Sequence, residues 1–270
     1  MKFSAILILN YIKMWWLLVV AMVVLFISFF RKSKIPKIIW SYWNDENIPE
    51  ITKKCISTWR KHNPDYDIRV LTPKTASELI GDMKFKHNDS PQRESDYVRL
   101  MVLSKYGGVW CDASIIMIKP LPKKNCEFFG YYLEKFTSNK KFPVIESWFF
   151  MCEKGSTFVG MWRDEFLRLN SFDTIKDYVN DVESNGVDLQ KISQKEYLSI
   201  HVSSQYVQQK LGPVNLCLEK AEDGPLQLVD DPSRLLKICK GTNTPFIKLR
   251  GGERRMVEEN WEKYSCLFSL

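Results

Sequence analysis

The chain has 270 residues, of which 45% are apolar and 26% are charged, so it can build a globular core and is not a disordered tail. Its net charge of +7 arises within residues 1–61, which carry ten basic and three acidic side chains, while residues 62–270 carry twenty-nine of each. A neutral main body lacks the dense basic face that nucleic-acid binding requires, so we expect no nucleic-acid partner.

The first element in chain order is an apolar segment. Residues 14–30 contain no charged side chain, and a run over residues 11–30 has the length of about 20 residues that spans a bilayer. The run is long for a cleaved signal peptide, and no small-residue cleavage site follows it. We therefore expect a membrane anchor over residues 1–32, crossing the membrane once through residues 11–30, and a single domain over residues 33–270.

The charges that flank this segment predict its orientation. Four cations follow the segment and outweigh the cations before it, which by the positive-inside tendency places the main domain in the cytosol. The margin is narrow, so a Golgi-type lumenal orientation stays open. The cysteines favour the same side, because their odd number, scattered placement and lack of C-x-x-C pairs indicate buried thiols in a reducing compartment. They are Cys55, Cys111, Cys126, Cys152, Cys217, Cys239 and Cys266.

Strands and helices alternate in the part of the chain that follows. Short β-branched and aromatic runs indicate strands, whereas apolar residues at helical spacing, bounded by proline or glycine, indicate helices. The expected strands lie at 35–40, 67–71, 109–111, 115–118 and 144–152, and the expected helices at 51–62, 90–105, 156–169, 174–182 and 197–209. This alternation predicts an α/β fold that starts as a parallel sheet. The end of the chain shows only short apolar pieces at 214–218, 226–229 and 246–249 and an amphipathic tail around 256–268.

A group of charged residues is expected where two of these elements meet. Asp96 and Arg99 are three residues apart in the helix at 90–105, so both project from one face. Asp112 interrupts the apolar run between residues 109 and 118, at the carboxyl end of a strand, where ligands of open α/β sheets bind. From spacing alone, such an Asp96 and Arg99 more often form only an ion pair on the helix surface.

These residues suit an anionic ligand held together with a metal ion. Magnesium takes oxygen ligands and usually relies on one or two carboxylates together with substrate phosphates. Asp112 is therefore a candidate metal ligand, with Ser114 as a weaker oxygen ligand. Gly107 and Gly108 offer backbone that a bulky ligand can approach closely. The pattern thus indicates a metal and diphosphate site.

Three motifs stand in order along this part of the chain: Ile35-Pro36-Lys37-Ile38-Ile39-Trp40, then Ser95-Asp96-Tyr97-Val98-Arg99, then Lys105-Tyr106-Gly107-Gly108-Val109-Trp110-Cys111-Asp112-Ala113-Ser114 with Lys119-Pro120-Leu121. Together they resemble the capsular polysaccharide synthesis family. That family is similar to the glycosyltransferases with a DXD sugar-binding motif, the Och1-like mannosyltransferases and the catalytic domains of large clostridial glucosylating toxins. The resemblance covers residues 35–121 well.

The resemblance implies a GT-A nucleotide-diphospho-sugar transferase fold. It implies a hexosyltransferase that moves a sugar from a nucleotide-sugar donor to a glycan or lipid-linked acceptor, and the segment at 11–30 would anchor this enzyme in a membrane. The implied setting is capsule-like or surface polysaccharide synthesis, and the implied cofactor is Mn²⁺ or Mg²⁺.

Carried over residue by residue, the resemblance also implies roles. Trp40 would lie against the nucleobase, while Asp96 and Arg99 would bind the ribose and the sugar or phosphate of the donor. Asp112 would be the first aspartate of the DXD motif. Ser114 stands at the position of the second aspartate, which removes a charged ligand, so we expect a metal held loosely and completed by the donor diphosphate and water.

The resemblance to retaining relatives implies front-face attack by the acceptor hydroxyl, with Arg99 and a cation stabilising the leaving phosphate. An inverting enzyme would instead need a side-chain base, for which Glu146 is the candidate. His201 is a candidate contact for a distal metal or an acceptor. Two alternatives stay open: a non-catalytic sugar- or nucleotide-binding member of the fold, and a membrane-anchored interaction protein.

Overall fold

The computed structural model describes residues 13–16, 19, 35–82, 84–226, 233–241 and 243–270. The chain divides into two units, residues 1–33 and residues 34–270. The run predicted to cross a membrane, residues 11–30, falls mostly outside the described residues. Among the helices that are described, none combines the length and the apolar character needed to span a bilayer. The membrane anchor therefore stays a prediction.

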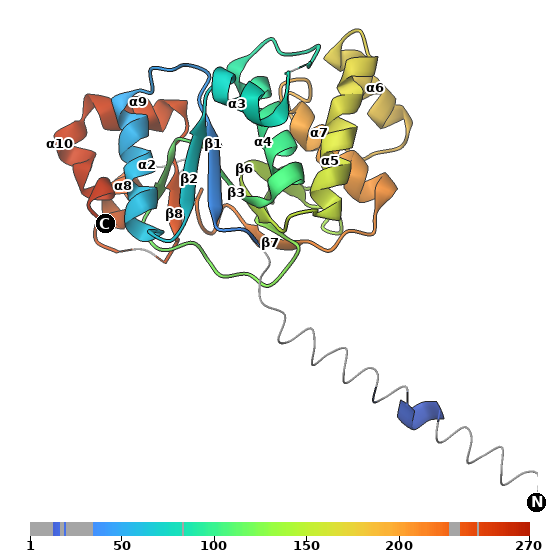
Figure 1. The fold of residues 1–270 in the computed structure, drawn as a ribbon, viewed down its shortest axis with the longest axis horizontal. Coiled ribbons are helices and arrows are strands. Elements are labelled where there is room, and N and C mark those ends of the chain that lie inside the picture. Colours follow the sequence, from blue (N-terminus) through green and yellow to red (C-terminus); the bar gives the residue numbers. More distant parts are fainter. Residues whose placement is uncertain (1–12, 17–18, 20–34, 83, 227–232, 242) are drawn as a thin grey trace, which may run out of the picture. The chain divides into compact units, whose positions relative to one another are not determined.

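A six-stranded sheet lies at the centre of the main unit (Figure 1). Its strands, in spatial order, are β2 (Asp67–Leu71), β1 (Ile38–Tyr42), β3 (Gly108–Cys111), β6 (Val144–Cys152), β5 (Phe128–Leu133) and β7 (Cys217–Lys220). Strand β1 runs parallel to β2 and β3, and β5 runs parallel to β7, whereas β6 is antiparallel to both β3 and β5.

The expected parallel start of the sheet is correct for β2, β1 and β3, and further along this sheet β6 runs opposite to the other five strands. The chain passes between the first three strands through α2 (Glu50–His62), α3 (Pro73–Ile80) and α4 (Pro91–Tyr106), and helical crossovers leave neighbouring strands parallel. Strands β5 and β6 are joined by residues 134–143 without a helix, and a short connection of this kind joins antiparallel neighbours. The sheet is therefore mixed.

A separate two-stranded sheet brings the C-terminal part of the chain beside the end of β3. Strand β4 (Ile115–Met117) pairs antiparallel with β8 (Phe246–Lys248), and Ile115 lies opposite Lys248. The backbone N–H of Leu249 extends this pairing by donating to the carbonyl of Ser114 (3.1 Å). Residues far apart in the sequence are thereby fixed next to the candidate site.

Helices cover both faces of the large sheet, and the last three pack against α2 and the two-stranded sheet. Besides α2, α3 and α4 they are α5 (Thr157–Leu167), α6 (Ile175–Ser184), α7 (Ser199–Tyr206), α8 (Ser233–Ile238), α9 (Gly251–Glu259) and α10 (Trp261–Tyr264), with 3-10 turns at Arg168–Ser171 and Ser265–Phe268 and a π-helical turn at Val207–Leu211. Successive strand residues face opposite sides. Trp110 and Phe150 accordingly pack with side chains of α4, α5 and α7, whereas Val109 and Phe149 pack with side chains of α2.

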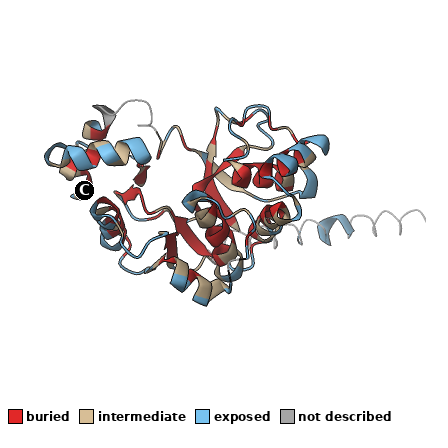
Figure 2. Ribbon diagram, turned by 90° about the horizontal axis from the view of Figure 1, so that it is seen from above, coloured by how far each residue is buried: buried red, intermediate tan, exposed pale blue. Residues whose placement is uncertain are grey.

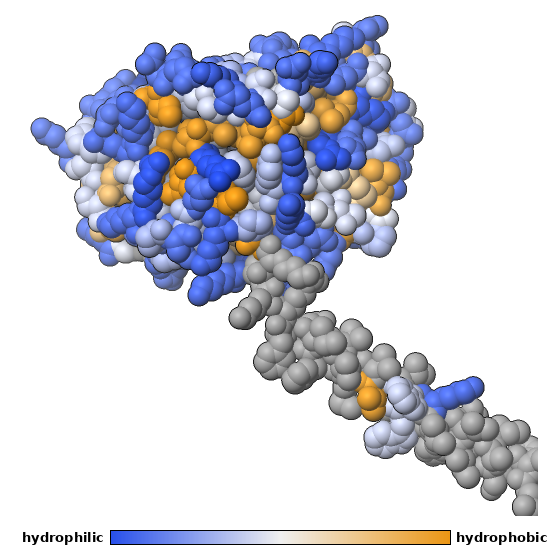
Figure 3. Space-filling model, in the orientation of Figure 1, coloured by the Kyte–Doolittle hydropathy of each residue, from blue (hydrophilic) through white to orange (hydrophobic). Residues whose placement is uncertain are grey.

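The distribution of buried and exposed residues follows from this layering. Figure 2 shows the buried residues concentrated in the sheet and on the inward faces of the helices. Figure 3 shows that the outer face of the main unit is mostly hydrophilic, with hydrophobic residues gathered in its central part. The core is therefore built on both sides of the sheet, and the site lies where the strands end.

Two cysteines depart from the expectation of buried free thiols. Cys239 and Cys266 form a disulfide that ties the end of α8 to the 3-10 turn at Ser265–Phe268. Of the free cysteines, Cys126 and Cys217 are half-buried and the other three are buried. Disulfides persist in oxidising compartments. The cysteines therefore give no support to a cytosolic main domain. Only the charges that flank the apolar segment still favour that orientation.

Candidate functional site

Helix α4 carries two of the predicted site residues and is fixed at both ends. Ser90 caps its first turn by accepting a backbone hydrogen bond (3.3 Å), and Pro91 fits the first helical position because no N–H is needed there. The helix stops at Gly107, where φ is +65°. Asp96 and Arg99 lie on its buried face.

The conformation of the backbone, and not contact with a ligand, requires glycine at positions 107 and 108. Both have positive φ (65° and 103°), a conformation that residues with side chains rarely adopt. A Cβ on Gly107 would lie 2.5 Å from the backbone nitrogen of Lys154, and one on Gly108 would lie 2.7 Å from the carbonyl of Ile38. Neither glycine lines the cleft that holds the other site residues, so the expected approach of a ligand to this backbone is wrong.

The turn after β3 presents Asp112 to the cleft. Its N–H donates to the carbonyl of Trp148 on β6 (2.9 Å), and its carbonyl accepts from the N–H of Ile115 (3.0 Å), which closes the turn between β3 and β4. The indole of Trp110 donates to Asp112 Oδ1 (3.0 Å). Backbone and side chain of Asp112 are therefore both anchored by neighbours at the strand end.

One ion network joins the predicted site residues. Arg99 Nη2 lies 3.2 Å from Asp96 Oδ1 and 3.3 Å from Asp112 Oδ1. Lys248 Nζ, from β8, lies 2.6 Å from Asp112 Oδ2 and donates to Ser114 Oγ at 2.9 Å. The structure thus brings Asp96, Arg99, Asp112 and Ser114 to one place and adds Lys248, which sequence reasoning had not singled out.

Burial and charge act in opposite directions on the two carboxyl groups. Burial raises the pKa of Asp96 to about 6, against the lowering effect of Arg99. Burial also acts to raise the pKa of Asp112, but Lys248 and Arg99 outweigh it, so this pKa lies below its ordinary value. Near neutral pH Asp112 is ionised, whereas Asp96 takes up a proton as the pH falls through about 6.

The network faces a cleft of about 780 Å³ with an excess of positive charge in its lining. Five Lys or Arg side chains line it against three carboxylates. The cations are Arg99, Lys135, Lys248, Arg250 and Arg254, and the carboxylates are Asp96, Asp112 and Glu146. Hydrogen bonds from cationic side chains to phosphate oxygens are shorter and stronger than those between neutral groups, so this lining suits a phosphate-bearing ligand.

The predicted tryptophan, Trp40, does not lie in the cleft, whereas Trp43 and Trp148 do. Trp40 is fully buried, and its indole N–H donates to the carbonyl of Gly107 (3.0 Å). It does not line the cleft, because alternation along β1 points it into the core beside α4, so its expected contact with a nucleobase is wrong. Trp43, just past the end of β1, is half-buried and does line the cleft, with Arg254 Cζ 5.9 Å from the centre of its ring.

A second polar pair faces the same cleft. Glu146 on β6 and His201 on α7 are both buried, and Glu146 Oε2 lies 3.4 Å from His201 Nε2. The other ring nitrogen of His201 has no hydrogen-bond partner among the described residues. A buried polar atom without a partner is costly. Within the described part of the chain, His201 therefore carries an unpaired, solvent-inaccessible ring nitrogen beside the cleft.

The residues around Asp112 fit a divalent metal ion poorly. Both Asp112 carboxylate oxygens already accept from Arg99, Trp110 or Lys248, and the Ser114 oxygen is neutral and bound to Lys248. No three His, Cys, Asp or Glu side chains group as metal ligands in the part of the chain that the structure describes. A metal here would also face the ammonium, and even two unit charges 4 Å apart repel by about 4 kcal/mol at an effective dielectric constant of 20. The expected Mn²⁺ or Mg²⁺ is not confirmed.

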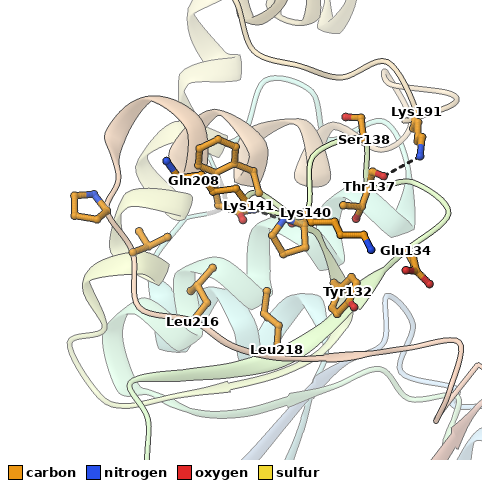
Figure 4. Close-up of a pocket in the computed structure, with 14 residues that line it drawn as sticks. Tyr132, Glu134, Thr137, Ser138, Lys140, Lys141, Lys191, Gln208, Leu216 and Leu218 are labelled. Atoms are coloured by element: carbon orange, nitrogen blue, oxygen red, sulfur yellow. Dashed lines mark hydrogen bonds between the residues drawn. The ribbon is translucent and has the colours of Figure 1, made fainter.

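A second hollow, of about 690 Å³, has a different character (Figure 4). Its lysines, Lys140, Lys141 and Lys191, are exposed, and Lys191 donates to the carbonyl of Thr137 (3.1 Å). None of the predicted site residues lines it. We therefore assign the candidate site to the cleft at the end of β3.

The match to a known family centres on the same part of the chain. The family described as capsular polysaccharide synthesis protein matches residues 27–180, which include α4, β3 and the turn with Asp112. The chain belongs to this family. The match ends before β8, so Lys248 lies beyond the matched residues.

Two sequence relatives have names that state an activity. The chain is 28% identical over 161 residues to O-glycosyltransferase PaGT of Phomopsis amygdali, which covers 49% of this chain and 38% of that protein. It is 26% identical over 131 residues to inositol phosphoceramide mannosyltransferase 1 of Schizosaccharomyces pombe, which covers 42% of this chain and 41% of that protein. The chain spans less than half the length of each of these relatives.

Among solved structures, the ligand-free glycosyltransferase domain of the YGT toxin matches 84% of this chain and 90% of its own chain at 10% identity, with a TM-score of 0.44. The apo form of the glycosyltransferase GlyE of Streptococcus pneumoniae matches 87% of this chain and 62% of its own at 10% identity, with a TM-score of 0.42.

Proposed function

We propose that the chain is a glycosyltransferase of the GT-A type that moves a sugar from a nucleotide-sugar donor to an acceptor hydroxyl. The observation that carries this proposal is the convergence of Arg99, Lys248 and Asp112 in one positively charged cleft at the carboxyl end of β3. Membership of the family supports it, as do the two relatives that are named as glycosyl- or mannosyltransferases.

The charge that develops during transfer explains the need for these cations. The bond between the sugar C1 and the diphosphate oxygen breaks, the bond between C1 and the acceptor oxygen forms, and the electron pair stays on the leaving phosphate. Arg99 and Lys248 are placed to stabilise this growing negative charge. Removing one preorganised donor of this kind from an enzyme typically lowers kcat about 10²- to 10³-fold.

Two further residues are proposed to position the donor. Trp43 replaces Trp40 as the candidate for stacking on the nucleobase, because Trp43 lines the cleft and is half-buried, whereas Trp148, which also lines it, is buried. Asp96 is proposed to accept hydrogen bonds from donor hydroxyl groups, since its carboxylate is held next to the cations by Arg99. Ionised Asp96 accepts such bonds better than the protonated form, so donor binding should weaken as the pH falls through about 6.

For the stereochemistry we propose retention, on the basis of the family resemblance. The acceptor hydroxyl then gives its proton to an oxygen of the leaving phosphate, and no side-chain base takes part. The inverting alternative assigns that proton to Glu146, whose carboxylate lies beside His201 in the same cleft. Substitution of Glu146 separates the two routes.

We further propose a membrane setting, on sequence features. Residues 11–30 would anchor the protein, and the acceptor would be a glycan or a lipid-linked glycan in surface polysaccharide synthesis. The fission-yeast relative is named for a lipid acceptor, which supports an acceptor at a membrane. The flanking charges favour a cytosolic main domain.

The test is a donor screen on the purified full chain. A panel of nucleotide sugars is offered, and the release of nucleoside diphosphate is measured; we expect turnover of one of them. Asp112→Asn should lower the release strongly, whereas Asp164→Asn should not, because Asp164 is an exposed partner of Arg163 on α5. Nucleotide binding without any turnover would favour the non-catalytic alternative, and absence of both would favour the interaction protein.

A further inference from the structure

We propose that the ammonium of Lys248 takes the place of a divalent metal ion in this cleft and binds the diphosphate of the donor directly. Nucleotide binding would then require neither Mn²⁺ nor Mg²⁺. The inference rests on the proposed function, because it specifies how the same site holds its nucleotide-sugar donor. It is carried by the position of Lys248 between the two residues predicted to ligate a metal, Asp112 and Ser114.

The backbone fixes where this ammonium lies. Lys248 is paired with Ile115 in the β4–β8 sheet, and the next residue, Leu249, donates its N–H to the carbonyl of Ser114 (3.1 Å). The Lys248 side chain is 13% exposed, in contrast to a solvated surface lysine. The ammonium is therefore part of the site's framework and is already in place before a ligand binds.

The hydrogen bonds of Lys248 leave one donor for a ligand. An ammonium group carries three N–H bonds. One is directed to Asp112 Oδ2 (2.6 Å) and one to Ser114 Oγ (2.9 Å), and the third has no partner among the described residues. Lys248 lines the cleft, as does Arg99 on the other side of Asp112, so a diphosphate entering the cleft can meet both cations.

The charges of the site also balance with an ammonium. Two aspartates of a DXD motif carry two negative charges and match the two positive charges of a divalent ion. This chain has one aspartate and one serine at those positions, Asp112 and Ser114, and the single negative charge matches the single positive charge of Lys248. The serine at the second position of the motif and the lysine on β8 are therefore consistent with each other, because a single ammonium matches a single carboxylate.

The test is calorimetric binding of nucleoside diphosphates to the full chain. Uridine, guanosine, adenosine and thymidine diphosphates are titrated in excess EDTA and again in excess Mn²⁺, and Mn²⁺ alone is titrated into the nucleotide-free chain. We expect one diphosphate to bind with the same Kd in both conditions, and Mn²⁺ alone to give no saturable binding. Lys248→Met should weaken binding in EDTA about ten- to hundredfold, since it removes one charged hydrogen bond.

The matched control is Lys191→Met, which removes a lysine from the second hollow and should leave the Kd unchanged. Binding that appears only with Mn²⁺ would overturn the role of Lys248 and leave the proposed function standing. Equal binding by Lys248→Met and the native chain in EDTA would overturn it as well. No binding of any diphosphate in either condition would overturn both. The comparison of the Kd in EDTA with the Kd in Mn²⁺ needs only the native chain. The proposal therefore stays testable if Lys248→Met unfolds.

Discussion

Two hollows of similar volume, about 780 Å³ and about 690 Å³, differ in how they hold their charges. In the first, Arg99 and Lys248 are largely buried and paired with one carboxylate at the end of β3. In the second, the lysines are exposed, with Lys140 and Lys141 in the loop after β5 and Lys191 in the segment after α6. An exposed lysine gains little from meeting an anion, because solvent screens the pair and the side chain loses freedom. A cation already fixed by its neighbours avoids that loss. Charge organisation, and not volume, distinguishes the candidate site.

The largest effect is expected when the carboxylate that organises the first cleft is neutralised. Asp112→Asn keeps the shape but removes the charge that holds both Arg99 and Lys248. We expect kcat/KM for the donor that is turned over to fall about 10³-fold. Initial rates of nucleoside diphosphate release measure this, with Asp164→Asn as the control. A loss of less than tenfold would place the reaction elsewhere.

The next effect tests geometry at constant charge. Arg99→Lys keeps one positive charge, but an ammonium lacks the planar fork that now contacts both Asp96 and Asp112. A decrease of about 10² in kcat is expected. Arg163→Lys, at the half-buried partner of the exposed Asp164 on α5, makes the same change outside the cleft and should leave kcat unaltered. Equal rates for both variants would contradict the assigned role of the guanidinium.

The buried carboxyl of the first cleft should appear in the pH dependence of stability. The folded state raises the pKa of Asp96 from 3.8 to about 6, so it binds the proton more tightly than the unfolded chain does. The free energy of unfolding therefore falls as the pH rises from about 4 to about 6. The decrease is about 3 kcal/mol, because the pKa of Asp96 differs by about 2 between the folded and the unfolded chain. Asp96→Asn should remove this decrease.

Urea unfolding of both proteins from pH 4 to pH 8 measures that prediction. The variant should gain stability relative to the native chain as the pH rises through this window, and the difference should become constant above about pH 7. The lowered pKa of Asp112 acts in the opposite direction but is common to both proteins. A difference that does not change with pH would show that Asp96 titrates normally.

A smaller effect separates the two stereochemical routes. Under retention, Glu146→Gln should lower kcat by less than about tenfold, whereas loss of a general base typically costs about 10²- to 10⁴-fold. The matched control is Glu219→Gln, because Glu219 lies on β7 and is an exposed partner of Lys124. The anomeric configuration of the product, read by NMR, gives an independent answer. An inverted product together with a large loss would assign the base to Glu146.

No effect is expected in the second hollow. Lys191→Met removes the lysine that donates to the Thr137 carbonyl, on a surface that holds none of the site residues. Turnover should match that of the native chain. A decrease in kcat/KM with the acceptor, at unchanged donor binding, would instead make this hollow part of the acceptor path and remove the contrast between the two regions.

Those parts of the first cleft that depend on neighbouring residues in the sequence could be predicted. Helix α4 is long, capped by Ser90 and stopped by Gly107, so its extent and the shared face of Asp96 and Arg99 follow from spacing. Asp112 was recognisable as a carboxylate inside an apolar run. Strand β5 and helix α3 were missed, because the run Phe128–Leu133 shows no polar–apolar alternation and is interrupted by a glycine, and α3 is only eight residues long.

The remainder of the site depends on contacts that the sequence does not specify locally. Lys248 stands 136 positions from Asp112, and the β4–β8 pairing that joins them has only three residues on each strand. Its one local signal is a single charge within the apolar piece at 246–249, the same kind of interruption that singled out Asp112. The sequence correctly predicted an aromatic residue near the site but assigned the wrong one. Only the observed strand register shows that Trp40 faces the core and that Trp43 faces the cleft.

The distance along the chain between Asp112 and Lys248 has a consequence for biogenesis. A ribosome adds about 5 to 20 residues per second, so the 136 residues between them take roughly 7 to 27 s to appear. For that interval the nascent chain holds Asp112 with Arg99 as its partner but without its β8 lysine. The phosphate-binding cleft is therefore completed late, once β8 has emerged and paired with β4, and a chain released before that point would carry most of the fold without a working site.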